Sequence, residues 1–230
     1  KKAQEMISIL TNEYDDYINT QRAKGEFALW EGDTLDAIKQ LESVSEKNDG
    51  DWITLTKIYI ARKSVTKAEK SLNNIKDRDD LRRLKKELFA SLSYAKGDFK
   101  KAYEQFDELS DSSFAIAYNK ILSAYQDGRY EFVLSKGTTI YSQSSGQDRI
   151  DCARVLANAA ISLKKWEDVR YWNEQLDVLD NPSATVKYNL AVASFQLNLR
   201  EKALQYYQQT QKLDPSMKNK KIEEWINVSS

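Results

Sequence analysis

The stretch from 51 to 68 reads DWITLTKIYIARKSVTKA and contains two apolar patterns on either side of a polar turn. Before the turn, Trp52, Leu55 and Tyr59 recur at the spacing of one helix face. After the turn, a charged segment ends on the small residue Ala68. The stretch therefore predicts a helix, a tight turn and a second helix that packs back on the first.

Related phrases recur along the whole chain at a nearly constant interval of about 33 residues. A single helical hairpin cannot bury its apolar face, whereas stacked hairpins share a continuous core. The interval therefore predicts an all-α array of helical hairpins. A small or β-branched residue ends each copy of the phrase, at Ala37, Ala68, Ala102, Val133, Val169 and Ala203.

Glycines and polar residues mark the expected turns. Gly32, Gly97 and Gly128 each follow a predicted first helix, where glycine adopts the left-handed conformation without steric cost. Asn181 and Pro182 predict the start of another helix, because asparagine caps helices and proline fits the first helical position. The polar segment Ser142–Gln147 predicts a longer loop.

The composition argues against several classes of protein. The 230 residues include 35 basic and 35 acidic side chains, so no net charge favours nucleic acid as a partner. Histidine is absent and cysteine occurs once, which excludes Ser-His-Asp and Cys-His catalysis, histidine-ligated metals and an intrachain disulfide. No run of about 18 apolar residues predicts a membrane span. We therefore expect no catalytic residues, no metal ligands and no cofactor.

The repeated pattern resembles the tetratricopeptide repeat, whose unit of about 34 residues carries W-x2-L-G-x2-Y and then alanine. Thr56 replaces the glycine of that pattern, and Asp214-Pro215 closes the last copy as the family does. Ile121 departs from the small residue that the family has in its first helix. The other copies keep a small residue at this position, where two helices approach closely: Gly25, Ala90, Ala157 and Ala191.

This resemblance implies a right-handed superhelical solenoid of antiparallel helix pairs, with about six repeats over residues 18–217. Residues 218–230 are expected to form a capping helix and tail, with Ile222, Trp225 and Ile226 on one side. Residues 1–17 are expected to form a helix, either a cap or part of a repeat. Ala3, Ile7 and Leu10 repeat the second-helix spacing, so we expect that further repeats, an export signal or an anchor preceded them.

In this family, the first helices line a concave groove that binds peptides. Asparagine suits such a groove because its amide both donates to and accepts from a peptide backbone. Arg154 and Asn158 also resemble a pair in the family's carboxylate clamp, although Asn219 and Glu223 stand where further basic residues would lie. By this resemblance, the candidate groove residues are Asn119, Arg154, Asn158, Tyr188, Asn189, Tyr118, Tyr125 and Phe195.

Each candidate also has an alternative interpretation. The aromatic side chains are equally compatible with packing between helices. Arg154 and Asn158 are compatible with a solvated helix face, or with an ion pair to a neighbouring carboxylate. The basic run Arg82–Lys86 lies beside aspartates, a pattern typical of local pairs on a solvated helix.

The resemblance implies a non-catalytic scaffold for a protein or peptide partner, in a bacterial envelope, pilus or secretion complex. Two alternatives stay open. One is a regulatory or sensor domain that controls an attached effector domain of a longer protein. The other is a structural module that self-associates into a homo-oligomer. The cell envelope or periplasm and the cytoplasm both stay open as locations.

Overall fold

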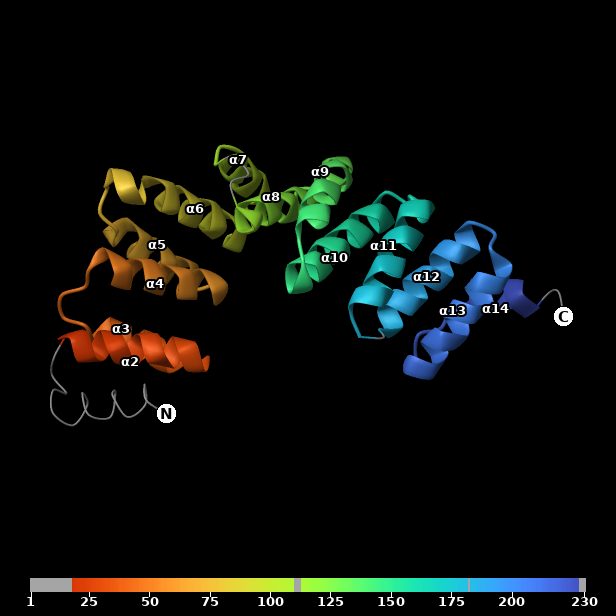
Figure 1. Cartoon of the computed structure of the whole chain (residues 1–230), viewed down its shortest axis with the longest axis horizontal. Helices are drawn as coiled ribbons and strands as arrows, with labels where there is room; N and C mark the ends of the chain where they lie inside the picture. Colours follow the sequence, from red (N-terminus) through yellow and green to blue (C-terminus); the bar gives the residue numbers. More distant parts are fainter. Residues whose placement is uncertain (1–17, 110–112, 182, 228–230) are drawn as a thin grey trace. The chain divides into compact units, whose positions relative to one another are not determined.

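The structure is a computed structural model that describes residues 18–109, 113–181 and 183–227. All regular elements within these ranges are helices, and they follow one another in adjacent pairs (Figure 1). The predicted all-α class is therefore confirmed. The expected N-terminal helix, with Ala3, Ile7 and Leu10, lies outside the described residues.

The chain divides into two compact units, residues 1–109 and residues 110–230. In the first unit, three helix pairs pack as α2 with α3, α4 with α5, and α6 with α7. The six helices of this unit are α2 (Ile18–Glu31), α3 (Thr34–Ser43), α4 (Asp49–Ala61), α5 (Val65–Asn74), α6 (Asp79–Ala95) and α7 (Phe99–Asp107).

The second unit contains three further pairs and a final short helix. Its pairs are α8 with α9, α10 with α11, and α12 with α13, and α14 packs against α13. The bounds are α8 (Phe114–Gln126), α9 (Tyr130–Gln143), α10 (Gly146–Ser162), α11 (Trp166–Leu179), α12 (Ala184–Gln196), α13 (Arg200–Leu213) and α14 (Lys220–Asn227).

One residue in the left-handed conformation makes the turn inside each pair. In the first pair, Gly32 has a φ of 85°, and the next amide, that of Asp33, donates to the Ala28 carbonyl at 2.8 Å. Half of the turns use the predicted glycines, and the other half use larger residues. The six turn residues are Gly32, Lys63, Gly97, Gly128, Lys164 and Asn198.

The helix that opens the stretch from 51 to 68 begins with a capping box. The Asn48 side chain accepts from the Asp51 amide at 3.0 Å, and the Asp51 carboxylate accepts from the Asn48 amide at 2.8 Å. Asp51 is buried, and Arg22 of α2 donates to its carboxylate at 2.9 Å. The cap thus fixes the start of α4 and also ties α4 to the preceding pair.

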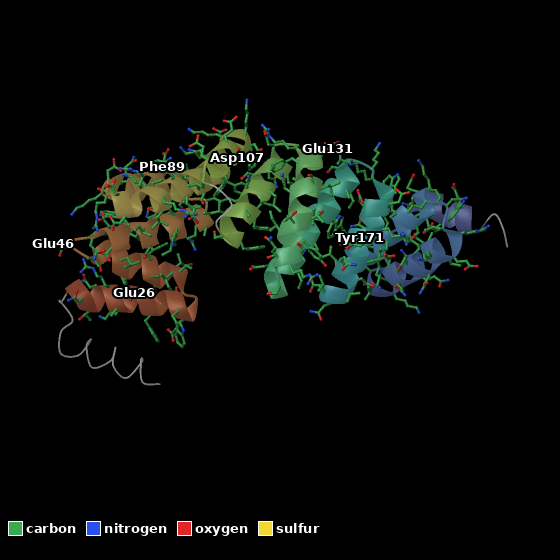
Figure 2. All side chains as sticks on the ribbon, turned by 45° about the horizontal axis from the view of Figure 1, so that its top comes forward. Glu26, Glu46, Phe89, Asp107, Glu131 and Tyr171 are labelled. Atoms are coloured by element: carbon green, nitrogen blue, oxygen red, sulfur yellow. The ribbon has the colours of Figure 1, made fainter. Side chains whose placement is uncertain are left out.

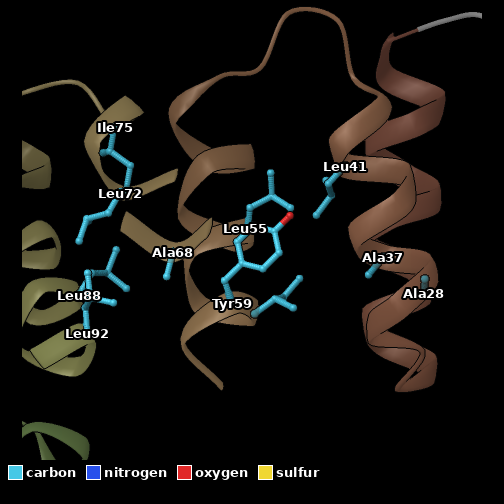
Figure 3. Packing of buried hydrophobic residues seen from close by; sticks show 11 residues of the cluster. Ala28, Ala37, Leu41, Leu55, Tyr59, Ala68, Leu72, Ile75, Leu88 and Leu92 are labelled. Atoms are coloured by element: carbon cyan, nitrogen blue, oxygen red, sulfur yellow. The ribbon is translucent and has the colours of Figure 1, made fainter. Parts of the chain in front are cut away.

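Small side chains lie at the contacts between helices, as the sequence predicts. In the first unit, Leu55 and Tyr59 of α4 lie between Leu41 of α3 and Ala68 of α5 (Figure 3). A Cβ atom at Gly25 would lie 2.8 Å from the Leu41 Cγ, so this position has no room for a side chain. The residues that end the repeated phrase are all buried: Ala37, Ala68, Ala102, Val133, Val169 and Ala203.

The fourth pair places its small residue on the opposite helix. Ile121 of α8 is fully buried, and Gly137 of α9 provides the missing space. A Cβ atom at Gly137 would lie 2.8 Å from the Leu156 Cδ2 of α10 and 3.5 Å from the Ile121 Cδ1. The departure at Ile121 is therefore compensated by a glycine on its partner helix.

Two boundary predictions are wrong. Helix α12 begins at Ala184 after Ser183, not at Asn181-Pro182. The polar loop predicted over Ser142–Gln147 shrinks to two residues, because α9 continues to Gln143 and α10 begins at Gly146. Ser144 is buried there and donates to the Tyr141 carbonyl at 2.9 Å, so serine closes a helix rather than extending a loop.

Cys152 is fully buried in α10, and its Sγ donates to the Gly137 carbonyl at 3.7 Å. Burial, with Asp148 and Asp151 nearby, raises the pKa of the thiol to about 12. Only about one thiol in 10,000 is then ionised at pH 8. We expect iodoacetamide at pH 8 to leave the folded chain unlabelled and to label the denatured chain, as measured by mass spectrometry. Rapid labelling of the folded chain would contradict this burial.

Candidate functional site

A groove in the second unit brings together three of the predicted residues. Arg154 and Asn158 of α10 and Asn189 of α12 line one cavity of about 330 Å³. Asn173 and Leu176 of α11 lie between them in the lining. The remaining lining residues are Ala157, Asp180, Ser183, Thr185 and Val186.

Arg154 is held by two carboxylates at the edge of this groove. Its guanidinium donates to Asp151 one turn earlier and to Asp180 after α11, each at 3.0 Å. The ion-pair interpretation of Arg154 therefore describes its contacts. An incoming carboxylate would have to compete with Asp180 for this guanidinium.

Asn173 is a groove residue that the sequence analysis missed. It is fully buried, and its amide group donates to the Val169 carbonyl at 2.8 Å. Its carbonyl oxygen accepts from the Asn189 amide group at 3.2 Å. Asn173 thus fixes the orientation of Asn189.

A signal for Asn173 is present in the sequence. Four residues after the residue that ends the repeated phrase, four of the other copies place a large side chain, such as Phe106 or Tyr207, and the fourth copy has Gly137. Asparagine at this buried position is costly unless both ends of its amide are hydrogen-bonded. A polar residue at a core position therefore points to a partner on the neighbouring helix.

Neither Tyr188 nor Phe195 lines the cavity. Tyr188 contacts Asn219, just before α14, and Phe195 contacts α14 itself. The Tyr188 hydroxyl accepts from the Asn219 side chain at 3.1 Å, and Phe195 meets Trp225 edge to face at 4.9 Å. Tyr207 accepts from the Asn219 amide at 2.9 Å and donates to Glu223. These contacts match the packing interpretation, and they explain why Asn219 and Glu223 replace the basic residues of a clamp.

The three candidates on α8 lie apart from the groove residues. Tyr118 stacks on Phe114 with ring centroids 5.5 Å apart, and Tyr125 lies 5.5 Å from the ring of Tyr130. Asn119 is half-buried. The structure therefore gathers Arg154, Asn158 and Asn189, but not the α8 residues, around one cavity.

Acidic and basic side chains are intermixed on the exposed surface of each unit. Figure 2 shows both oxygen and nitrogen tips over the helices of each unit. In the basic run from Arg82, Arg82 forms the predicted local pair with Asp79, whereas Lys85 donates to the Ile75 carbonyl at 2.9 Å. Within the described residues, no group of histidine, cysteine and acidic side chains could hold a metal ion. Among these helices, none has both the length and the apolar character of a membrane span.

No protein-family model matches the sequence, and the comparison with curated proteins finds no match. Solved structures do match. The chain is 14% identical to PilW, a widely conserved type IV pilus biogenesis factor, with a TM-score of 0.70 over 91% of this chain and 98% of that one. It is 14% identical to PilF of Pseudomonas aeruginosa, with a TM-score of 0.67 over 92% and 97%.

A third similar structure is a tetratricopeptide repeat protein from Parabacteroides merdae. It is 12% identical, with a TM-score of 0.63 over 97% of this chain and 90% of that one. The likeness spans nearly the full length of each protein, although the sequences have diverged. Together with the paired helices, the left-handed turns and the small residues at the helix contacts, it shows that this chain has the tetratricopeptide repeat fold.

Proposed function

We propose that this chain is a non-catalytic scaffold that binds an extended segment of a protein partner in the groove of α10, α11 and α12. The observation that carries the proposal is the pair of amides from Asn158 and Asn189 at one cavity. Asn158 is exposed, and Asn189 is held by the buried Asn173. Side-chain amides suit a peptide main chain, which offers a donor and an acceptor at most residues.

The apolar part of the groove supports the same function. Leu176 is buried and Val186 is half-buried, and both line the cavity beside the amides. A bound segment would place its backbone along Asn158 and Asn189 and an apolar side chain over Val186. The paired Arg154 would contribute little to affinity, because its charge is already balanced by Asp180.

The similar structures supply a setting for this function. PilW and PilF are both pilus proteins by name, and the likeness covers nearly all of each chain. We therefore propose that the partner is a subunit of a pilus or another bacterial envelope complex, and that this chain helps to assemble it. The other candidates lie outside this cavity, and the proposal does not depend on them: Tyr118, Asn119 and Tyr125 of α8, and Tyr188 and Phe195 of α12.

The test selects peptides from a displayed random library on the full chain and measures their affinities by calorimetry. We expect the double variant Asn158→Ala/Asn189→Ala to bind selected peptides about 10- to 30-fold more weakly, because it loses hydrogen bonds from two side chains. The matched control is Gln208→Ala, which removes an exposed amide from α13.

Three outcomes separate the interpretations. Weakening in the double variant alone supports the groove. Equal binding by the double variant and the parent would contradict it and would move the search to another face. Peptides whose binding depends on a free C-terminal carboxylate would point to a clamp at Arg154 instead of main-chain recognition.

A further inference from the structure

A second cavity lies in the first unit, among α3, α4 and α5, and it shares no residue with the groove of the second unit. Its volume is about 310 Å³, at the lower end of the range for ligand sites. Trp52 and Leu55 of α4 form an apolar wall, together with the ring of Tyr59. Leu55 and Tyr59 are buried and Trp52 is half-buried, so an apolar group that enters would cover the indole.

Three lysines surround this apolar wall: Lys47 before α4, and Lys67 and Lys70 on α5. The Lys47 ammonium lies 5.5 Å from the centroid of the Trp52 ring, and the Lys67 ammonium lies 5.3 Å from that of Tyr59. Both contacts place a positive charge against an aromatic ring, which makes the cavity amphipathic.

The lysines retain hydrogen-bond donors for a ligand. Lys47 uses two of its three donors on the carbonyls of Glu42 and Val44, at 2.8 and 2.6 Å. Lys67 uses one donor on the Glu42 carboxylate, at 3.0 Å. The Lys70 ammonium has no hydrogen-bond or ion-pair partner among the described residues. The cavity therefore has unused donors and an excess of positive charge.

Glu42 shows that the cavity stabilises a carboxylate. Its side chain accepts from the Tyr59 hydroxyl and from Lys67. The hydrogen bond from Tyr59, followed by that from Lys67, lowers the pKa of Glu42. Glu42 is the only acidic residue in the lining, against three lysines. A second carboxylate, brought by a ligand, would find Lys70 and the remaining donors of Lys47 and Lys67.

We propose that this cavity, which we name the lysine–tryptophan cavity after Lys47, Lys67, Lys70 and Trp52, binds an acidic peptide segment of a partner protein. An apolar side chain of the segment covers the half-buried Trp52, and the flanking carboxylates pair with the lysines. The charge of the cavity selects the acid, and its apolar wall selects a peptide over a simple anion. The site is independent of the groove in the second unit, so either can be disproved alone.

The probe is a fluorescein-labelled peptide with one leucine between two pairs of glutamates. Its controls replace all four glutamates with glutamine, or the leucine with glycine. Anisotropy with the full chain is expected to show binding of the acidic leucine peptide at least about tenfold tighter than of either control. The affinity should fall as sodium chloride rises from about 50 to about 300 mM, because salt screens exposed charges.

The variant Lys70→Glu reverses one exposed charge in the cavity and is expected to weaken binding about tenfold. The matched control Lys57→Glu reverses an exposed charge of α4 that does not line the cavity, and it should change affinity by less than about twofold. Circular dichroism verifies that both variants fold. Equal effects of the two reversals, or equal binding of the glutamate and glutamine peptides, would overturn the proposal. Equal binding of the glycine peptide would reduce the cavity to an anion site and would overturn it too.

Discussion

Replacing Phe106 with alanine is expected to lower the free energy of unfolding by about 3–5 kcal/mol, because the ring is buried. Phe106 is 1% exposed and lies on α7, one turn after the buried Ala102. Helix α7 has nine residues, and these two are its buried positions. Loss of the ring would leave Ala102 as the one buried side chain of α7.

The measurement is urea unfolding of the full chain followed by far-ultraviolet circular dichroism. Phe89→Ala serves as the matched control, because Phe89 belongs to the same unit but is 37% exposed on α6. It should cost less than about 1 kcal/mol. If both variants lose the same stability, the burial of Phe106 is not what stabilises the last pair of this unit.

The second large effect is expected at Gly137, where two helices approach α9. Gly137→Val should destabilise the chain by about 1–3 kcal/mol, because the new side chain would overlap Leu156. Its Cβ alone would lie 2.8 Å from the Leu156 Cδ2. Ser135→Val, on the exposed face of the same helix, should stay within about 0.5 kcal/mol of the parent.

A double-mutant cycle identifies the cause. Leu156→Ala alone should cost about 2–5 kcal/mol, since Leu156 is fully buried. In the double variant Leu156→Ala/Gly137→Val, the loss of unfolding free energy should be smaller than the sum of the two single losses by about 1 kcal/mol or more. The reason is that the valine fills space that the leucine leaves. Strict additivity in urea unfolding would mean that Gly137 matters for a reason other than its contact with Leu156.

The sequence predicted the fold because the helix faces and the glycine turns of each repeat follow preferences that act between residues close in sequence. Ala68 and Ala102 recur at the period of the hairpin, and Gly97 turns the chain where glycine is favoured. Asn198 follows the same preference, because asparagine adopts the left-handed conformation more easily than most residues. The same approach could not identify Lys63 and Lys164 as turn residues, because lysine has no local preference for this conformation.

The candidate site was predicted only in part, for a different physical reason. The repeat register placed Arg154, Asn158 and Asn189 on first helices, and these three line one cavity. The register could not show that Asp180 neutralises Arg154, or that Asn173 holds Asn189, because each contact joins residues that lie far apart in the sequence. The register also could not distinguish Tyr188 from residues that line a groove, although its hydroxyl accepts a hydrogen bond from Asn219, just before α14.

Helix α14 also bears on how an array of this kind changes in length by duplication. Ile222 is buried against Ala191 and Tyr207, on the surface to which a following hairpin would have to attach. A duplicated hairpin placed just ahead of Lys220 would have to offer Ile222 the same alanine and tyrosine contacts. Gain or loss of a helix pair before α14 therefore depends on whether the new neighbour keeps these two residues.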